Sequence, residues 1–206
     1  FNFVQTEYFK ESEASAKSDV VQKLVPNALW YFRWAAAFTF LTGLYLLYWL
    51  SITVNIGIVL GALMGTLMAA NVWFVIWPNQ KKVIAGAPDA ADAGAKAGLA
   101  SRTNTLFSLP MLYLMVFSAH GGSLPMIAAT DMTGLWVGIA IIVLIEANAL
   151  FGKMNPLITS VKAVIHSGLL LTLVFGILVH YLLFFYKHKG SLTPLFFDLN
   201  FCNRVF

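Results

Sequence analysis

The sequence predicts an all-α fold, a polytopic bundle of about five transmembrane helices. Of the 206 residues, 59% are hydrophobic and only 11% are charged, against roughly 45–50% and about 25% in soluble globular proteins. The charges are also segregated, because residues 34–80 and 103–130 contain no Asp, Glu, Lys or Arg. A soluble core could not cover that much apolar surface, so the chain is expected to lie in a membrane.

Five segments carry the roughly 20 apolar residues that a membrane-crossing helix needs. In order along the chain they are residues 28–52, 55–77, 104–128, 133–151 and 159–186. Together they make a transmembrane domain over residues 28–186. Pro110 lies within the third segment and is expected to kink that helix without ending it, because neighbouring helices can satisfy the freed backbone group.

Three other regions flank or interrupt these spans. Residues 1–27 form a polar amino-terminal segment in which residues 6–23 could form a surface helix. Residues 78–103 are expected to be a cytoplasmic loop, flexible over the Ala- and Gly-rich part 84–100. Residues 187–206 are expected to form an aromatic tail at the membrane interface or against a partner.

The distribution of Lys and Arg predicts the orientation, because cytoplasmic loops are enriched in both. With the N-terminus in the cytoplasm, ten of these residues fall on the inner side: Lys10, Lys17, Lys23, Arg33, Lys81, Lys82, Lys96, Arg102, Lys153 and Lys162. Three fall on the outer side: Lys187, Lys189 and Arg204. The N-terminus is therefore predicted to be cytoplasmic and the C-terminus periplasmic.

Charge and cysteine content exclude several classes of protein. The net charge is +4, but the basic residues flank apolar spans, so they indicate topology rather than a nucleic-acid partner. The single cysteine, Cys202, excludes an internal disulfide and a Cys-rich metal site, and no C-x-x-C-H motif for covalent c-type haem is present. Because the chain starts at Phe1 without Met, we expect further sequence before it, and no signal peptide is visible.

The second predicted span carries a ridge of small residues at four-residue spacing: Gly57, Gly61, Gly65 and Ala69. Such a ridge lets another helix approach closely, whereas lipid alone gives helices little reason to associate. The ridge predicts helix packing in a bundle and no chemistry of its own.

Two histidines at similar predicted depth form the first candidate site. His120 lies in the outer part of the third span, and His180 lies near the outer end of the fifth. Imidazole suits axial ligation of haem iron, so the pair predicts one b-type haem. The alternative is that each histidine hydrogen-bonds a neighbouring helix. His166 lies about 21 Å before His180 on the same helix, but no second histidine is available at its depth.

The inner half of the membrane holds a second candidate, an intramembrane polar cluster. Its predicted members are Asn71, Glu146, Asn148 and Lys162, with His166 nearby. Ionisable groups at membrane depth are costly, so Glu146 is expected to pair with Lys162 or His166. The functional interpretations are a proton path, a quinone pocket or a substrate pocket. The alternative is a structural pair that joins the fourth and fifth helices.

Two long segments resemble a known family. Residues 61–81 read GALMGTLMAANVWFVIWPNQK and residues 100–112 read ASRTNTLFSLPML. Both segments, with the continuation to His120, resemble the transmembrane domain of bacterial membrane-bound urate oxidases (urate hydroxylases). The resemblance is strongest over residues 30–122. Residues that match the family's intramembrane asparagine, its Pro-Asn-Gln turn and the histidine ending its Pro-containing helix are Asn71, Asn79, Gln80 and His120.

The resemblance implies a multi-pass protein of the bacterial inner membrane, with a c-type cytochrome and other membrane subunits as partners. Full-length relatives have further transmembrane helices and a cytochrome c domain, which this sequence lacks. The resemblance assigns no catalytic residue to this chain.

Three functions remain open from the sequence. The first is a membrane electron-transfer subunit that holds b-type haem near the periplasmic face and exchanges electrons with a c-type cytochrome or a larger redox complex. The second is a cofactor-free accessory or scaffold subunit of a respiratory or photosynthetic complex. The third is a catalytic membrane oxidase acting on urate or a related purine. The first is favoured, because no nucleophile–base pair, phosphate loop or cluster of metal-binding carboxylates is visible.

Overall fold

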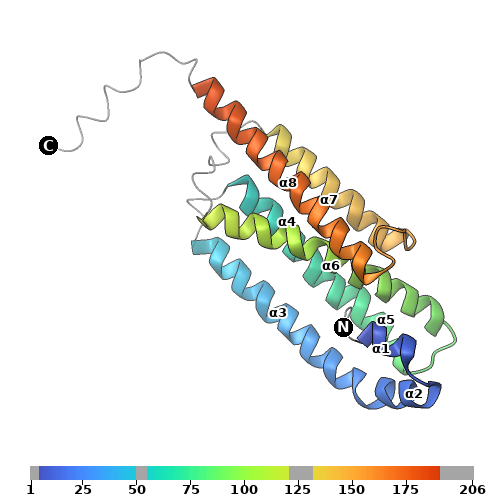
Figure 1. Cartoon of the computed structure of the whole chain (residues 1–206). Coiled ribbons are helices and arrows are strands. Elements are labelled where there is room, and N and C mark those ends of the chain that lie inside the picture. Colours follow the sequence, from blue (N-terminus) through green and yellow to red (C-terminus); the bar gives the residue numbers. More distant parts are fainter. Residues whose placement is uncertain (1–4, 50–54, 121–131, 191–206) are drawn as a thin grey trace.

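The computed structural model describes residues 5–49, 55–120 and 132–190, and nearly all of these residues are helical (Figure 1). The elements are α1 (Gln5–Glu11), α2 (Ala14–Lys23), α3 (Val25–Trp49), α4 (Ile56–Ala70), the π-helix η2 (Asn71–Ile76), α5 (Trp77–Ile84), α6 (Ala90–His120), α7 (Thr133–Phe151) and α8 (Val161–Gly190). No strand forms within the described ranges, so the prediction of an all-α fold is confirmed.

Helices α1 and α2 form the polar amino-terminal segment, where the sequence predicted a surface helix. The helix is broken once, at residues 12–13. No residue of α2 is buried, and its ion pair between Lys23 and Asp19 is exposed, so α2 lies on the surface. Pro26 lies in the first turn of α3, where a helix tolerates proline.

Helix α4 packs antiparallel to α6 along the predicted glycine ridge. A side-chain carbon added at Gly57 would collide with Ser118, and one at Gly61 would lie 3.1 Å from Met115 Cγ. Residue numbers rise along α4 as they fall along α6, so the two helices run in opposite directions. The ridge does bring two helices together, as its small residues predicted.

Helix α8 packs parallel to α6 on another face. A side-chain carbon at Gly168 would lie 3.0 Å from Leu109 Cδ1, and one at Gly176 would lie 3.3 Å from the Tyr113 hydroxyl. Residue numbers rise together along both helices, so they run in the same direction. Helix α6 also contacts α5, η2 and α7, which makes it the central helix of the bundle.

The main hydrophobic core fills the space between α4, α6, α7 and α8. Its buried members are Ile56, Leu60, Met64, Phe107, Leu114, Leu135, Ile142, Phe175 and Val179. A smaller cluster joins the start of α6 to α8 and to the segment before it: Leu99, Leu106, Ile158 and Val164. These contacts fix the depth of each helix relative to α6.

The second span does not end at Trp77, as the sequence predicted, but continues to Ile84 through η2 and α5. Pro78 has no N–H group and would clash with the carbonyl four residues earlier in a regular α-helix. The wider π-helix directly before Trp77 accommodates this change, so the chain stays helical through the proline. The Pro-Asn-Gln segment is accordingly helical and not a turn.

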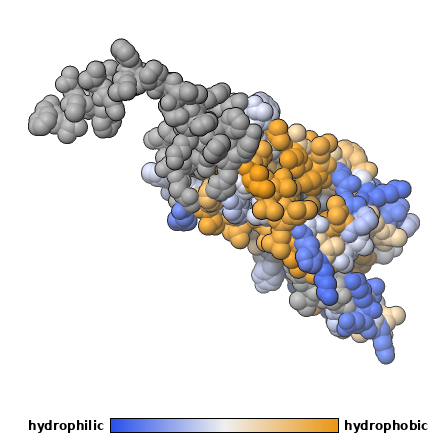
Figure 2. Space-filling model, turned by 45° about the horizontal axis from the view of Figure 1, so that its top comes forward, coloured by the Kyte–Doolittle hydropathy of each residue, from blue (hydrophilic) through white to orange (hydrophobic). Residues whose placement is uncertain are grey.

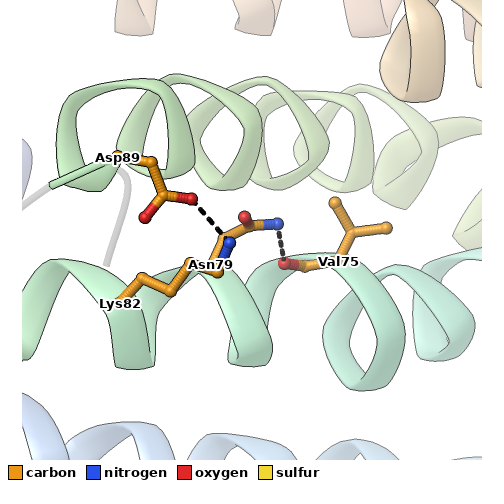
Figure 3. A network of polar contacts seen from close by, with 4 residues as sticks. All are labelled: Val75, Asn79, Lys82 and Asp89. Carbon is orange, nitrogen blue, oxygen red and sulfur yellow. Dashed lines mark hydrogen bonds and ion pairs between the residues drawn. The ribbon is translucent and has the colours of Figure 1, made fainter. Parts of the chain in front are cut away.

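A tight connection joins α5 to α6 (Figure 3). Gly86 adopts a positive φ of 63° there, which reverses the chain. Lys82 Nζ lies 2.6 Å from Asp89 Oδ2 across the connection, and the hydrogen bond from Lys82 lowers the pKa of the Asp89 carboxyl below its ordinary value of 3.8. Asn79 of α5 donates to the Val75 carbonyl of η2 at 2.7 Å.

Residues 78–103, predicted as a loop that is flexible over 84–100, are mostly helical: α5 continues to Ile84 and α6 starts at Ala90. The Ala-rich composition explains this result, because alanine has the highest helix propensity. Ala93, Ala97 and Ala100 are buried, so the small side chains also pack against neighbouring helices. Helix α6 continues through Pro110, as predicted.

Three helices are long and apolar enough to cross a membrane: Ile56–Ile84, Thr133–Phe151 and the described part of α8, Val161–Val179. Helices α3 and α6, also predicted as spans, are not among them. Helix α3 is rich in Trp and Tyr, which prefer the membrane interface. Helix α6 carries Thr103, Asn104, Thr105 and Ser108, which the surrounding helices partly cover. Figure 2 shows hydrophobic residues gathered over one broad area, with hydrophilic residues towards one end.

Candidate functional site: a polar triad between three helices

Asn71, Asn104 and Glu146 form a buried hydrogen-bonded group, here called the polar triad. Asn71 Nδ2 donates to Asn104 Oδ1 at 3.0 Å and to Glu146 Oε2 at 3.2 Å. The three residues are 1%, 9% and 7% exposed. They come from η2, α6 and α7, so the triad joins three helices near the centre of the bundle.

The π-helix and the triad are connected through α4. Asn104 Nδ2 also donates to the Met68 carbonyl at 3.0 Å, three residues before η2 begins at Asn71. A side chain that occupies a helix carbonyl competes with the helix's own hydrogen bond, which is a known cause of local widening. Segments of π-helix occur frequently at functional sites, and here the segment begins with a triad residue.

Two of the four residues predicted for the intramembrane cluster, Asn71 and Glu146, do meet. The other two do not join them. Asn148 is half-buried and Lys162 is exposed, as is His166. In the described part of the chain Glu146 forms no ion pair with Lys162 or His166, so the predicted charge pair is wrong: the carboxyl group is met by an amide instead.

Asn104 is the member of the triad that sequence reasoning missed. It lies in the third predicted span, at its very start, where a polar residue is ordinarily assigned to the membrane interface. The helical spacing from the buried Ala97 and Ala100 to Asn104 could have identified it, because these residues share one face of α6. That signal depended on treating residues 84–100 as helix.

The candidate haem ligands can be compared only in part. His120 is exposed at the end of α6, while the side chain of His180 lies outside the described residues. Parallel packing of α6 and α8 brings Gly176, one turn before His180, to the level of Tyr113, two turns before His120. The two histidines thus come to within about one helical turn of the same depth.

A second feature is a cluster of aromatic rings around Arg33. Its guanidinium lies 4.0 Å from the ring centre of Trp77 and 5.0 Å from that of Trp73. A shallow cleft of about 340 Å³ adjoins it, lined by residues that include Pro26, Trp30 and Lys81. Arg and Trp together are typical of the membrane–water interface. No three His, Cys, Asp or Glu side chains gather as a metal site in the part of the chain that the structure describes.

The fold and the site define the class first: an all-helical protein of the membrane type, with a buried polar centre inside an apolar bundle. Within this class, the family model described as urate oxidase N-terminal matches residues 53–179. The match covers more than half of the chain, and the chain belongs to this family. It includes every member of the polar triad and His120. No similar curated protein and no similar solved structure was found.

Proposed function

We propose that the chain is a membrane electron-transfer component of an oxidoreductase of the urate-oxidising kind, and that the polar triad exchanges the protons that accompany electron movement. The observation that carries the proposal is the environment of Glu146: a carboxyl group buried between helices, hydrogen-bonded by the Asn71 amide and without a cationic partner among the described residues. A purely structural carboxylate at such a position would ordinarily be paired with a cation.

The chemistry of the family's namesake reaction explains why proton exchange matters. Hydroxylation of urate by water forms one C–O bond and releases two electrons and two protons. A membrane component that passes on the electrons must leave the protons somewhere. Glu146 can bind and release a proton, while Asn71 and Asn104 hold the carboxyl group in place.

The electron carrier in this proposal is a b-type haem held by His120 and His180. When bound, such a group supplies reversible one-electron transfer. The support is the similar depth of the two histidines on parallel helices. A c-type cytochrome or a larger membrane complex would then be the partner, in a bacterial inner membrane.

We further propose that all five predicted helices cross the membrane, including α3 and α6. Helix α6 contacts α4 from Asn104, which bonds Met68, to Ser118, which bonds Asn55 at 2.9 Å. If α4 crosses the bilayer, a helix packed against it over that length runs through the same depth. The bundle would then have a cytoplasmic N-terminus and a periplasmic C-terminus.

The proton role is tested with Glu146→Gln, which keeps the shape and removes the titratable group. Membranes containing the wild-type chain should reduce added cytochrome c when urate is supplied. Glu146→Gln should lower this rate at least about tenfold, whereas Asp92→Asn, which changes an exposed carboxylate, should not. Equal rates in membranes without the chain would overturn the redox function. A rate of cytochrome c reduction in Glu146→Gln equal to that of the wild type would overturn the proton-exchange role of the triad.

The haem is tested by a dithionite-reduced minus oxidised spectrum of the purified chain. We expect a b-type signal in the wild type and in His188→Ala, and its loss in His120→Ala. A flat spectrum from a folded wild-type preparation would contradict haem binding. If the chain then co-purified with a large complex, the cofactor-free accessory function would take its place.

A further inference from the structure

Arg102 is a buried cation without a partner. Arg102 is 6% exposed, and its Nη1 atom is fully buried with no hydrogen-bond partner among the described residues. No ion pair involves it in that part of the chain, and the buried carboxyl of Glu146 bonds Asn71 instead. An unpaired buried charge is costly, so the absence of a protein partner calls for a partner from outside.

The position of Arg102 on α6 shows what it faces. The α6 residues that meet α8 are Leu106, Leu109 and Tyr113, and Arg102 continues this series one turn earlier, at the four- and three-residue spacing of one helix face. Leu99 and Leu106, which lie about one turn before and after Arg102 on this face, pack with Ile158 and Val164. Val161 is the first residue of α8.

Arg102 therefore lies on the face of α6 that packs against the amino-terminal end of a long helix. That end carries a partial positive charge and N–H groups without intrahelical partners. Ser160 meets one of them, because its hydroxyl accepts from the Ala163 amide at 3.1 Å. Lys162, which is exposed, adds a further positive charge in the same turn. A guanidinium and a helix amino terminus repel each other unless an anion lies between them.

We propose that Arg102 and the first turn of α8 bind an oxyanion of the phosphate type. A guanidinium offers two parallel N–H groups to such an anion, and helix N–H groups complete its coordination. The source is either the headgroup of an anionic phospholipid or a soluble oxyanion, and the site is independent of the redox function.

The test measures the thermal unfolding midpoint of the purified full chain in a mild neutral detergent. Phosphatidylglycerol, phosphatidylcholine and inorganic phosphate are added separately, the last against chloride at equal ionic strength. A ligand at about a hundredfold excess over its Kd should raise the midpoint of the wild type by about 5–10 °C. A rise with phosphatidylglycerol alone assigns the site to lipid, and a rise with inorganic phosphate assigns it to a soluble oxyanion.

Arg102→Met should abolish the rise, because it keeps the bulk of the side chain and removes the charge. Arg102→Lys should keep a smaller rise, and Lys96→Met, an exposed cation of the same helix, should keep all of it. No rise with either anionic probe, or an equal rise in Arg102→Met, would overturn the proposal. If Arg102→Met fails to fold, native mass spectrometry of the wild type decides: a retained phosphatidylglycerol or phosphate that Arg102→Lys holds less well supports the site, and its absence refutes it.

Discussion

Asn71 holds the polar triad together, because its amide group donates to both other members. Asn104 is additionally held by the Met68 carbonyl, whereas the described bond of Glu146 is the one from Asn71. The carboxyl group thus depends on one donor. The stability of the polar triad and the proposed proton exchange at Glu146 therefore both depend on the Asn71 amide.

We expect Asn71→Ala to lower the free energy of unfolding by at least about 1–3 kcal/mol, because it leaves the buried Glu146 carboxyl without its donor. Asn27→Ala, which removes an exposed asparagine that donates to the Lys23 carbonyl at the end of α2, is the control and should cost little. Unfolding by SDS in mixed micelles measures both. Since Asn71 and Asn104 share a bond, their double variant should cost less than the sum of the single ones; strict additivity would argue against the triad.

Much of this site was visible in the sequence, but its pairing was not. Asn71 and Glu146 stood out because polar residues are rare in apolar spans. Both belong to the polar triad, yet a charge rule assigned Glu146 to Lys162 or His166. Which face of a helix points inward depends on packing, and the exposure of Lys162 follows from the contact of α8 with α6 through Gly168.

At the scale of helices, close packing depends on positions where no side chain fits. Gly57 is the sharpest case, because an added carbon would collide with Ser118, whose hydroxyl bonds Asn55 at 2.9 Å. Asn55 also caps the start of α4 by accepting from the Ile58 amide at 2.9 Å. One substitution would therefore disturb both the helix contact and the helix cap.

Gly57→Ala should destabilise the bundle by about 1–3 kcal/mol, the usual cost of overpacking. Gly43→Ala is a matched control in α3, since an added carbon there meets nothing within 4 Å. It should be neutral or slightly stabilising, because alanine favours the helix over glycine. The thermal unfolding midpoints of the two variants test this prediction. Equal midpoints would mean that α4 and α6 do not pack closely at Gly57.

The connection between α5 and α6 should respond to pH through Asp89. Because the Lys82 hydrogen bond lowers the pKa of Asp89 in the folded state, the ion pair contributes stability above the ordinary pKa of about 4 and loses it as the pH falls through the folded value. Amide exchange at Ala90 and Ala93 should therefore be faster in Asp89→Asn than in wild type at neutral pH. The difference should shrink as the pH falls below the ordinary pKa and vanish once Asp89 is protonated in the folded state, and its persistence there would exclude the ion pair as its cause.

The helical elements were predictable to different degrees. Among the described residues, three of the five predicted spans form helices that are long and apolar enough to cross a membrane. The continuation through Pro78 was not predicted, because a proline ordinarily ends a helix and only the π-helix before it removes the clash. The Ala-rich start of α6 was misread since glycine suggested flexibility, although its buried alanines favour helix packing.

At the scale of the whole molecule, the number of crossings sets the topology. Three helices satisfy length and hydropathy, while α3 and α6 are proposed to cross as well. The alternation of directions supports five crossings: α4 is antiparallel to α6, and α6 is parallel to α8. Composition alone could not decide this, because a central helix shielded by its neighbours tolerates polar residues and an interfacial helix carries Trp and Tyr.

Cysteine labelling of intact cells separates the two topologies. In a Cys202→Ser background, single cysteines are placed along the chain at Ser15, Ser51, Ala91, Ser123 and Lys153. With five crossings, an impermeant maleimide should label only the second and fourth positions from outside, and the other three only after the membrane is opened. Labelling of Ser15→Cys and Ser51→Cys from the same side would show that α3 lies along the membrane. Labelling of Ala91→Cys and Ser123→Cys from the same side would show that α6 lies along the membrane. The polar triad would then lie outside the membrane interior, and its proposed function depends on that location.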